Sequence, residues 1–240
     1  MHKGGSGKTT TAINLATALH QKGKRTLLVD LDPQANATSG VGINPLRPQF
    51  NVNHLFTTAE IGAGDVITQA PSGLHVIPSH LDLGRTESGM KGSEVVMLRG
   101  LLKDIEGNYD FIIIDTPPRE GLLAVNALAL ADGVIIPLQA HYWAMEGLAA
   151  AIDQVAKVKE GLNPGIRIIG ILPTMMNART ILSKQVLEAA REAYPNEVYP
   201  FTVDFSIKHP EAATVGQPIV LYDPSHQGAL AYHRLAETLL

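Results

Sequence analysis

The feature that most constrains this chain is a run of small residues that leads directly into a helix-like stretch. Residues 3–10 read Lys-Gly-Gly-Ser-Gly-Lys-Thr-Thr, and residues 9–21 are predicted to form a helix. Successive small residues let backbone N–H groups point inward at an anion, and the positive N-terminal end of the helix faces the same point. The segment therefore predicts a loop that cradles phosphate groups.

Individual residues of this loop have expected roles. Lys8 is placed to reach the β- and γ-phosphates of a nucleotide, and the Thr9 hydroxyl is placed to hold Mg²⁺. The predicted nucleotide-binding residues are Gly4, Gly5, Ser6, Gly7, Lys8, Thr9 and Thr10. His2 stands where the strict pattern G-x-x-x-x-G-K-[ST] has glycine, so the loop fits a variant, K-G-G-x-x-K-[ST], with an additional lysine at Lys3.

Short apolar runs alternate with longer helical stretches along the rest of the chain. Buried strands are expected at residues 26–30, 74–78, 111–115, 133–137 and 166–172. Helices are expected at residues 9–21, 95–105, 121–131, 145–159, 180–193 and 227–240, and residues 40–72 are expected to form loops and short helices. This alternation predicts an α/β fold with a doubly wound, mostly parallel sheet flanked by helices, as in P-loop NTPases. No linker divides the chain, so a single domain over residues 1–240 is expected.

The predicted sheet lacks its first strand. A phosphate loop of this kind follows a β-strand, but only two residues precede Lys3. A strand of about five residues is therefore missing, and in this architecture it would lie centrally and aim the loop. We interpret this as a late start of the printed chain rather than as degeneration of the protein.

Acidic residues stand at the ends of two predicted strands. Asp30 and Asp32 close the run Leu-Leu-Val-Asp-Leu-Asp, and Asp115 closes the run Phe-Ile-Ile-Ile-Asp. Ligands of open α/β sheets bind at the carboxyl ends of the strands. We expect Asp115 to contact Mg²⁺ directly or through water, Asp30 to help hold the Mg²⁺ shell, and Asp32 to orient or polarise the attacking water. The predicted metal site is thus Thr9, Asp30 and Asp115.

Composition excludes several classes of protein. The chain has no cysteine, which excludes disulfides, thiolate zinc sites, iron–sulfur clusters and a cysteine nucleophile. No apolar run approaches the roughly 18 residues that a membrane span needs. A formal net charge of −4 over 240 residues argues against a constitutively basic nucleic-acid coat protein. No signal peptide opens the chain, so a cytoplasmic location is expected.

Three segments together resemble the ParA family of partition ATPases, which carries a deviant Walker A motif. They are KGGSGKTTTAINLATAL, LLVDLDPQANATSG and FIIIDTPP. Residues 137–147, 171–175 and 211–224 are similar to further stretches of the family, so the resemblance covers the chain except for the first strand. It implies ATP and Mg²⁺ as cofactors and a slow hydrolysis of ATP to ADP and phosphate that a partner stimulates.

The resemblance also implies roles for single residues. In the family, ATP drives the formation of a homodimer in which a signature lysine, here Lys3, reaches the partner's nucleotide. Asp32 matches the family's hydrolysis aspartate, so the predicted catalytic residues are Lys3, Lys8 and Asp32. Pro173 is a candidate contact to the adenine. The resemblance further implies that the ATP-bound dimer binds DNA non-specifically at the nucleoid and is released by a ParB-like or cargo adaptor protein.

Few of the family's basic DNA-binding positions are kept here. Lys208 remains, whereas Ser225 and Gln227 stand where basic residues are common. Arg179 and Arg234 are further candidates for a DNA-binding patch. Because non-specific DNA affinity depends on summed phosphate neutralisation, the loss of charges predicts weaker binding with a flatter salt dependence.

Other interpretations remain open. The protein could position a protein cargo, such as a carboxysome or a chemoreceptor cluster, instead of DNA. A MinD-like cell-division regulator needs a basic amphipathic tail, but residues 232–240 are short and nearly neutral, so no stable membrane association is expected. A reductase of the same superfamily needs cysteine ligands, which are absent, and turnover accelerated by a small organic acid would indicate a metabolic ligase.

Overall fold

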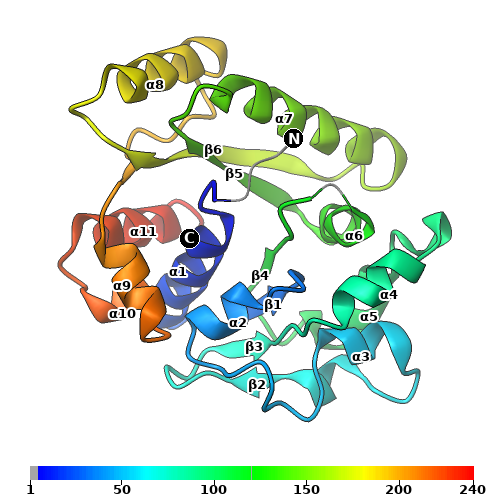
Figure 1. Ribbon diagram of the computed structural model, residues 1–240. Coiled ribbons are helices and arrows are strands. Elements are labelled where there is room, and N and C mark those ends of the chain that lie inside the picture. Colours follow the sequence, from blue (N-terminus) through cyan, green and yellow to red (C-terminus); the bar gives the residue numbers. More distant parts are fainter. Residues whose placement is uncertain (1–4, 120) are drawn as a thin grey trace.

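A computed structural model describes residues 5–119 and 121–240, and their strands form two hydrogen-bonded sheets (Figure 1). The strands of the first sheet are β1 (Thr26–Asp30), β2 (Thr68–Gln69), β3 (His75–Ile77) and β4 (Phe111–Asp115), in the order β2-β3-β1-β4. β1 is parallel to β3 and to β4, whereas β2 is antiparallel to β3. The second sheet contains β5 (Gly133–Gln139), β6 (Arg167–Met176) and β7 (Val203–Asp204), in that order and all parallel.

Helices surround these sheets. They are α1 (Lys8–Gln21), α2 (Asn36–Gly40), α3 (Val52–Thr57), η1 (Ala63–Val66), α4 (Leu83–Gly89), η2 (Gly92–Glu94), α5 (Met97–Glu106), α6 (Leu122–Leu130), α7 (Ala144–Gly161), α8 (Ile181–Ala193), α9 (Lys208–Thr214), α10 (Ile219–Tyr222) and α11 (Gln227–Glu237). Within the described part of the chain, none of them combines the length and apolar character needed to cross a membrane.

Alternate side chains of β1 pack against opposite helical layers. Leu28 lies in a cluster with Ile13 and Ala16 of α1, whereas Leu27 and Val29 lie in another with Leu98 and its neighbours from α5. Successive side chains of a strand point to opposite faces of the sheet, so a strand covered on both faces must be apolar throughout. This confirms the doubly wound arrangement that the continuous apolar runs predict.

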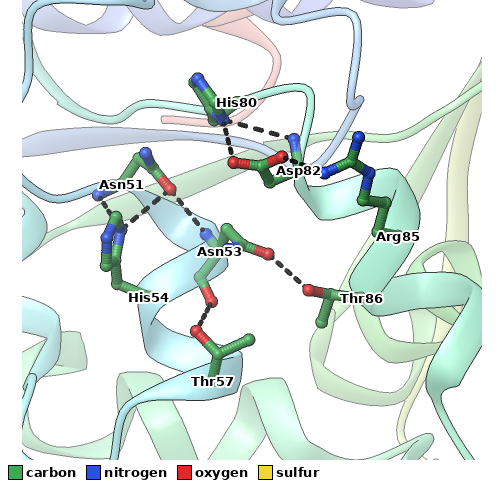
Figure 2. A network of polar contacts seen from close by, with 8 residues as sticks. All are labelled: Asn51, Asn53, His54, Thr57, His80, Asp82, Arg85 and Thr86. Atoms are coloured by element: carbon green, nitrogen blue, oxygen red, sulfur yellow. Dashed lines mark hydrogen bonds and ion pairs between the residues drawn. The ribbon is translucent and has the colours of Figure 1, made fainter.

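Polar contacts fix the small helices beside β3 (Figure 2). Asn51 caps the N-terminus of α3: its Oδ1 accepts a hydrogen bond from Asn53 N at 3.1 Å, and its N–H donates to His54 Nδ1 at 3.2 Å. The Thr86 hydroxyl of α4 donates to Asn53 Oδ1 at 2.6 Å. These bonds join α3 to α4 close to where the chain leaves β3.

The expected strands are all present, and the expected helices agree with the structure to within a few residues. The short antiparallel β2, the two-residue β7 and helices α9 and α10 are not anticipated by the sequence patterns. Helix α1 is buried on every side along residues 11–19. The reason is tertiary: α11 covers the side of α1 that the first sheet leaves open.

The strand and helix pattern predicts one mostly parallel sheet, whereas the strands of the described residues form two. Among the described residues no strand pairs with the outer edge of β4 or with the outer edge of β5. All five residues of β1 are buried, whereas residues 111–114 of β4 are half-buried although they are equally apolar. Helix α1 contacts both β4 and β5, so the two edges flank one helix. The division falls at the central position where a strand ahead of the phosphate loop is expected.

We expect a strand placed ahead of the phosphate loop to pair with β4 and β5. Extending the N-terminus by about five β-branched apolar residues should supply ladder hydrogen bonds to both edges and bury residues 111–114. Each kcal/mol gained in a domain of this size raises the melting temperature by about 2–4 °C, so a rise of several degrees is expected in thermal unfolding followed by circular dichroism. An extension of equal length made of glycine and serine is the control, and equal melting temperatures for the two would contradict the expectation.

Candidate nucleotide-binding site

The phosphate loop enters α1 through two glycines in left-handed backbone conformations. Gly5 has φ +103° and Gly7 has φ +92°, a region that L side chains rarely adopt. A Cβ atom on Gly7 would also lie 3.5 Å from the Thr174 side chain. The helix begins at Lys8, so Gly5 to Thr10 present a helix N-terminus as predicted for a phosphate site. Lys3 and Gly4 lie outside the described residues, and their roles stay predictions.

The second sheet holds this loop in place. The Thr174 hydroxyl of β6 donates a hydrogen bond to the Ser6 carbonyl oxygen at 2.8 Å, and Thr174 is buried. Pro173, the predicted adenine contact, is the buried residue before it in the same strand. The sequence analysis does not assign this anchoring role to Thr174, because the bond joins residues 168 positions apart.

Two predicted acidic residues meet at one edge of the first sheet. Asp30 and Asp115 are register partners in the parallel pair of β1 and β4, and both are buried. Burial lowers the pKa of Lys8, and the negative charges of Asp115 and Asp32 partly offset this effect. The structure therefore brings the phosphate-loop lysine and the acids of both strand ends into one site.

Asp115 is a carboxylate without a normal hydrogen-bond partner. Both of its oxygens are buried and unpaired among the described residues, although the Thr9 side chain lies beside it. Burial, followed by the charge of Asp30, raises the pKa of Asp115 to about 7. Mg²⁺ prefers oxygen ligands and is usually bound through one or two carboxylates plus phosphates and water. Asp115 and the Thr9 hydroxyl are a donor set that fits this ion.

Asp30 stands in a different environment from Asp115. Its Oδ2 accepts hydrogen bonds from Thr38 N at 2.8 Å and from Thr38 Oγ1 at 2.7 Å. Its Oδ1 accepts one from Asp32 N at 3.0 Å. Burial raises the pKa of Asp30 to about 6, and these hydrogen bonds hold it below the value for Asp115. Asp30 is predicted to help hold the Mg²⁺ shell, but both of its carboxylate oxygens already accept hydrogen bonds within the protein.

Asp32 heads a tight turn between β1 and α2. Its Oδ1 accepts a hydrogen bond from Gln34 N at 2.9 Å, and its carbonyl accepts one from Ala35 N at 2.8 Å. Ala35 has φ +52°, an uncommon conformation for a residue with a Cβ atom. The turn places Asp32 near enough to Lys8 for its charge to act on that lysine.

Arg179, one of the three candidate DNA-binding residues, lies apart from the other two, Lys208 and Arg234. Lys208 of α9 forms an ion pair with Glu211 at 2.9 Å and lies 5.8 Å from the centre of the Tyr222 ring. Arg234 is exposed on α11, and Arg179 is exposed in the turn before α8. Figure 1 shows α8 well apart from α9 and α11. Arg179 therefore does not add its charge to that of the other two residues, and the charge of Lys208 is partly compensated by Glu211.

Comparisons with known proteins agree with this geometry. A family model described as an AAA domain matches residues 1–168. The chain is 42% identical to the chromosome-partitioning ATPase Soj of Thermus thermophilus, over 99% of this chain and 92% of that protein.

Solved structures extend the similarity. The cobyrinic acid a,c-diamide synthase of Mycobacterium smegmatis, with bound ATP analog and magnesium, has a TM-score of 0.85 at 29% identity, covering 100% of this chain and 91% of that one. A plasmid partition protein of Borrelia burgdorferi has a TM-score of 0.78 at 27% identity, covering 99% and 93%.

We expect Asp115→Asn to stabilise the magnesium-free protein while abolishing magnesium-dependent turnover. The folded-state pKa of about 7 lies above the ordinary value of 3.8, so this carboxyl favours folding at low pH and loses that contribution as pH rises through about 7. The rise in pKa from 3.8 to about 7 means that the variant should gain up to about 4 kcal/mol in the free energy of unfolding at pH 8, and less as pH falls toward 4.

Urea unfolding across this pH range measures the effect, and the exposed Asp104→Asn on α5 is the matched control. A variant that is less stable than wild type at pH 8 would contradict the assignment of Asp115 as a buried, unpaired carboxylate.

Proposed function

The chain belongs to the ParA/Soj family of partition ATPases, and from this membership we propose that its ATP-bound dimer binds DNA without sequence preference. The dimer positions or segregates chromosome or plasmid DNA, and a ParB-like or cargo adaptor protein stimulates its slow hydrolysis. We place this cycle in the cytoplasm, at the nucleoid, and assign it to a single domain over residues 1–240.

The proposal rests above all on one observation: Lys8 of the phosphate loop lies in the same site as the acidic residues at the carboxyl ends of β1 and β4. Backbone N–H groups of residues 4–10 bind the phosphates, and Lys8 neutralises charge on the β- and γ-phosphates. Pro173 lies beside Thr174, which anchors the loop, so we place it on the adenine side of the site. Thr9 and Asp115 hold Mg²⁺, which when bound neutralises the charge that develops on the phosphates.

We propose that hydrolysis depends on two further residues. Asp32 orients the attacking water, because it lies at the same sheet edge as Asp115 and close to Lys8. Lys3 acts across the dimer interface, where a cation placed at the partner's γ-phosphate offsets transition-state charge as an arginine finger does. Turnover is then low in the monomer, because the site lacks the partner's lysine.

A second candidate function is the positioning of a protein cargo. The observation that favours it is the weak basic surface: Lys208 is paired with Glu211, and Arg179 and Arg234 lie on separate elements. Because non-specific DNA affinity depends on summed phosphate neutralisation, a weakly basic surface favours a function that does not depend on tight DNA binding alone. Neighbouring genes that encode a cargo adaptor instead of a ParB-like protein would favour this alternative.

We expect Lys3→Ala to separate dimerisation from nucleotide binding. Loss of the cation that reaches across the interface should leave ATP affinity by calorimetry close to wild type but prevent the ATP-dependent dimer detected by light scattering. Lys8→Ala should instead lose nucleotide binding, because it removes the main phosphate cation of the site itself. The exposed Lys103→Ala on α5 controls for loss of a charge, and an ATP-dependent dimer of Lys3→Ala would refute the cross-subunit role.

DNA binding is tested with non-specific duplex DNA, in ATP·Mg²⁺ and in ADP, at two salt concentrations. Binding should require ATP and weaken with salt. Lys208→Ala should weaken it and lower the slope of log affinity against log salt by about 1 per subunit. Glu211→Gln should strengthen it by releasing Lys208 from its ion pair. No binding with hydrolysis intact would contradict the DNA-positioning proposal.

A further inference from the structure

Thr38 connects three segments at the edge of the first sheet. Its N–H and its hydroxyl both donate to Asp30 Oδ2, at 2.8 and 2.7 Å. The same hydroxyl oxygen accepts a hydrogen bond from Ser79 N at 3.0 Å. Asp30, Thr38 and Ser79 have no exposed surface, so water does not compete for these bonds. A single side chain thus joins the end of β1, helix α2 and the chain leaving β3.

These bonds enclose the turn that carries Asp32. Asp30 and Thr38 lie on either side of it, and Asp30 Oδ1 also accepts the Asp32 N–H at 3.0 Å. The turn contains Ala35 at φ +52°, which the surrounding structure must hold in place. Without the Thr38 hydroxyl, one donor to Asp30 is lost and the Ser79 N–H is buried without a partner.

The segment that contains Ser79 is hydrogen-bonded to helix α3. Pro78 O accepts a hydrogen bond from Val52 N, the first residue of α3, at 2.8 Å. Ser79 follows Pro78 directly, so the donor to Thr38 is tied to an element that the capping contacts at Asn51 and Asn53 also fix. Thr38 therefore links the Asp32 turn to the segment Pro78–Ser79, which is hydrogen-bonded to α3.

We infer that Thr38 is a positioning residue for ATP hydrolysis, acting through Asp30 to hold Asp32 at the attacking water. This inference rests on the proposed role of Asp32. It assigns Asp30 to the support of the turn instead of to direct coordination of Mg²⁺. Nucleotide binding uses other groups, the phosphate loop and its anchor Thr174, so loosening the turn affects turnover more than affinity.

The test compares Thr38→Val, which keeps the shape of the side chain without the hydroxyl, with Thr38→Ser, which restores the hydroxyl. Thr38→Val should lower kcat at least about tenfold while KM for ATP changes less than about threefold, because small misplacements of catalytic groups are costly. Thr38→Ser should recover kcat to within about twofold of wild type, since the bond to Asp30 is restored.

Thr26→Val is the matched control. Thr26 is buried at the other end of the same strand, and its hydroxyl donates to Lys24 O at 3.1 Å, away from the site. It removes a buried hydroxyl as Thr38→Val does, but kcat should stay at the wild-type level. Amide hydrogen exchange of residues 31–38 should accelerate in Thr38→Val and not in Thr26→Val.

Three outcomes of the Thr38 and Asp32 measurements overturn the inference. If Thr38→Val keeps wild-type kcat while Asp32→Ala loses it, the positioning role alone fails. If Asp32→Ala also keeps wild-type turnover, the proposed role of Asp32 fails and the inference falls with it. If Thr38→Val raises KM by as much as it lowers kcat, Thr38 supports nucleotide binding instead.

A second variant covers the case in which Thr38→Val does not fold. Asp30→Asn keeps the size of the side chain but replaces one acceptor oxygen with a donor, which cannot accept the bonds from Thr38 or Asp32. Lower kcat at unchanged magnesium dependence would support the positioning role. A large increase in the Mg²⁺ concentration needed for half-maximal turnover would overturn it, because Asp30 would then be a metal ligand.

Discussion

Two carboxylates buried side by side, at the paired ends of β1 and β4, are the constraint on which this site depends. Placing like charges next to each other without water is unfavourable unless each is compensated. Asp30 is compensated inside the protein by three hydrogen bonds, whereas Asp115 has no partner of normal geometry among residues 5–119 and 121–240. In the proposed mechanism the two acids therefore have different roles: Asp30 supports the neighbouring turn, and Asp115 is available to a cation beside Lys8 and Thr9.

The phosphate loop depends on contacts with both sheets. α1 is buried along residues 11–19, with the first sheet on one side and α11 on the other. The Thr174 bond to Ser6 ties the start of the helix to β6 in the second sheet. Because β4 and β5 are not paired to each other, α1 and this bond bridge the two sheets at the site.

The surface chemistry bears on how the proposed cycle could be regulated. Lys208 is held by Glu211, and the chain carries a net charge of −4, so one subunit offers DNA little attraction. Non-specific affinity grows with the number of phosphates neutralised. A dimer presents each basic residue twice, so dimerisation on ATP would strengthen DNA binding even without a change of shape in either subunit. Weak sites in each subunit would thus make DNA binding depend on the nucleotide state.

The sequence by itself determined most of the strand and helix succession, the glycine-rich loop that enters a helix at Gly5 to Thr10, and Asp115 as the acid beside Thr9, since local patterns and short motifs carry that information. Lys3 stays a sequence prediction. Only the tertiary structure decided that the strands divide into two sheets, that Thr174 anchors Ser6, and that Thr38 and Ser79 enclose the Asp32 turn. It also decided that Asp30 is engaged by hydrogen bonds. These features depend on hydrogen bonds between residues far apart in the chain, and no local spacing encodes which distant donor will reach a buried acceptor.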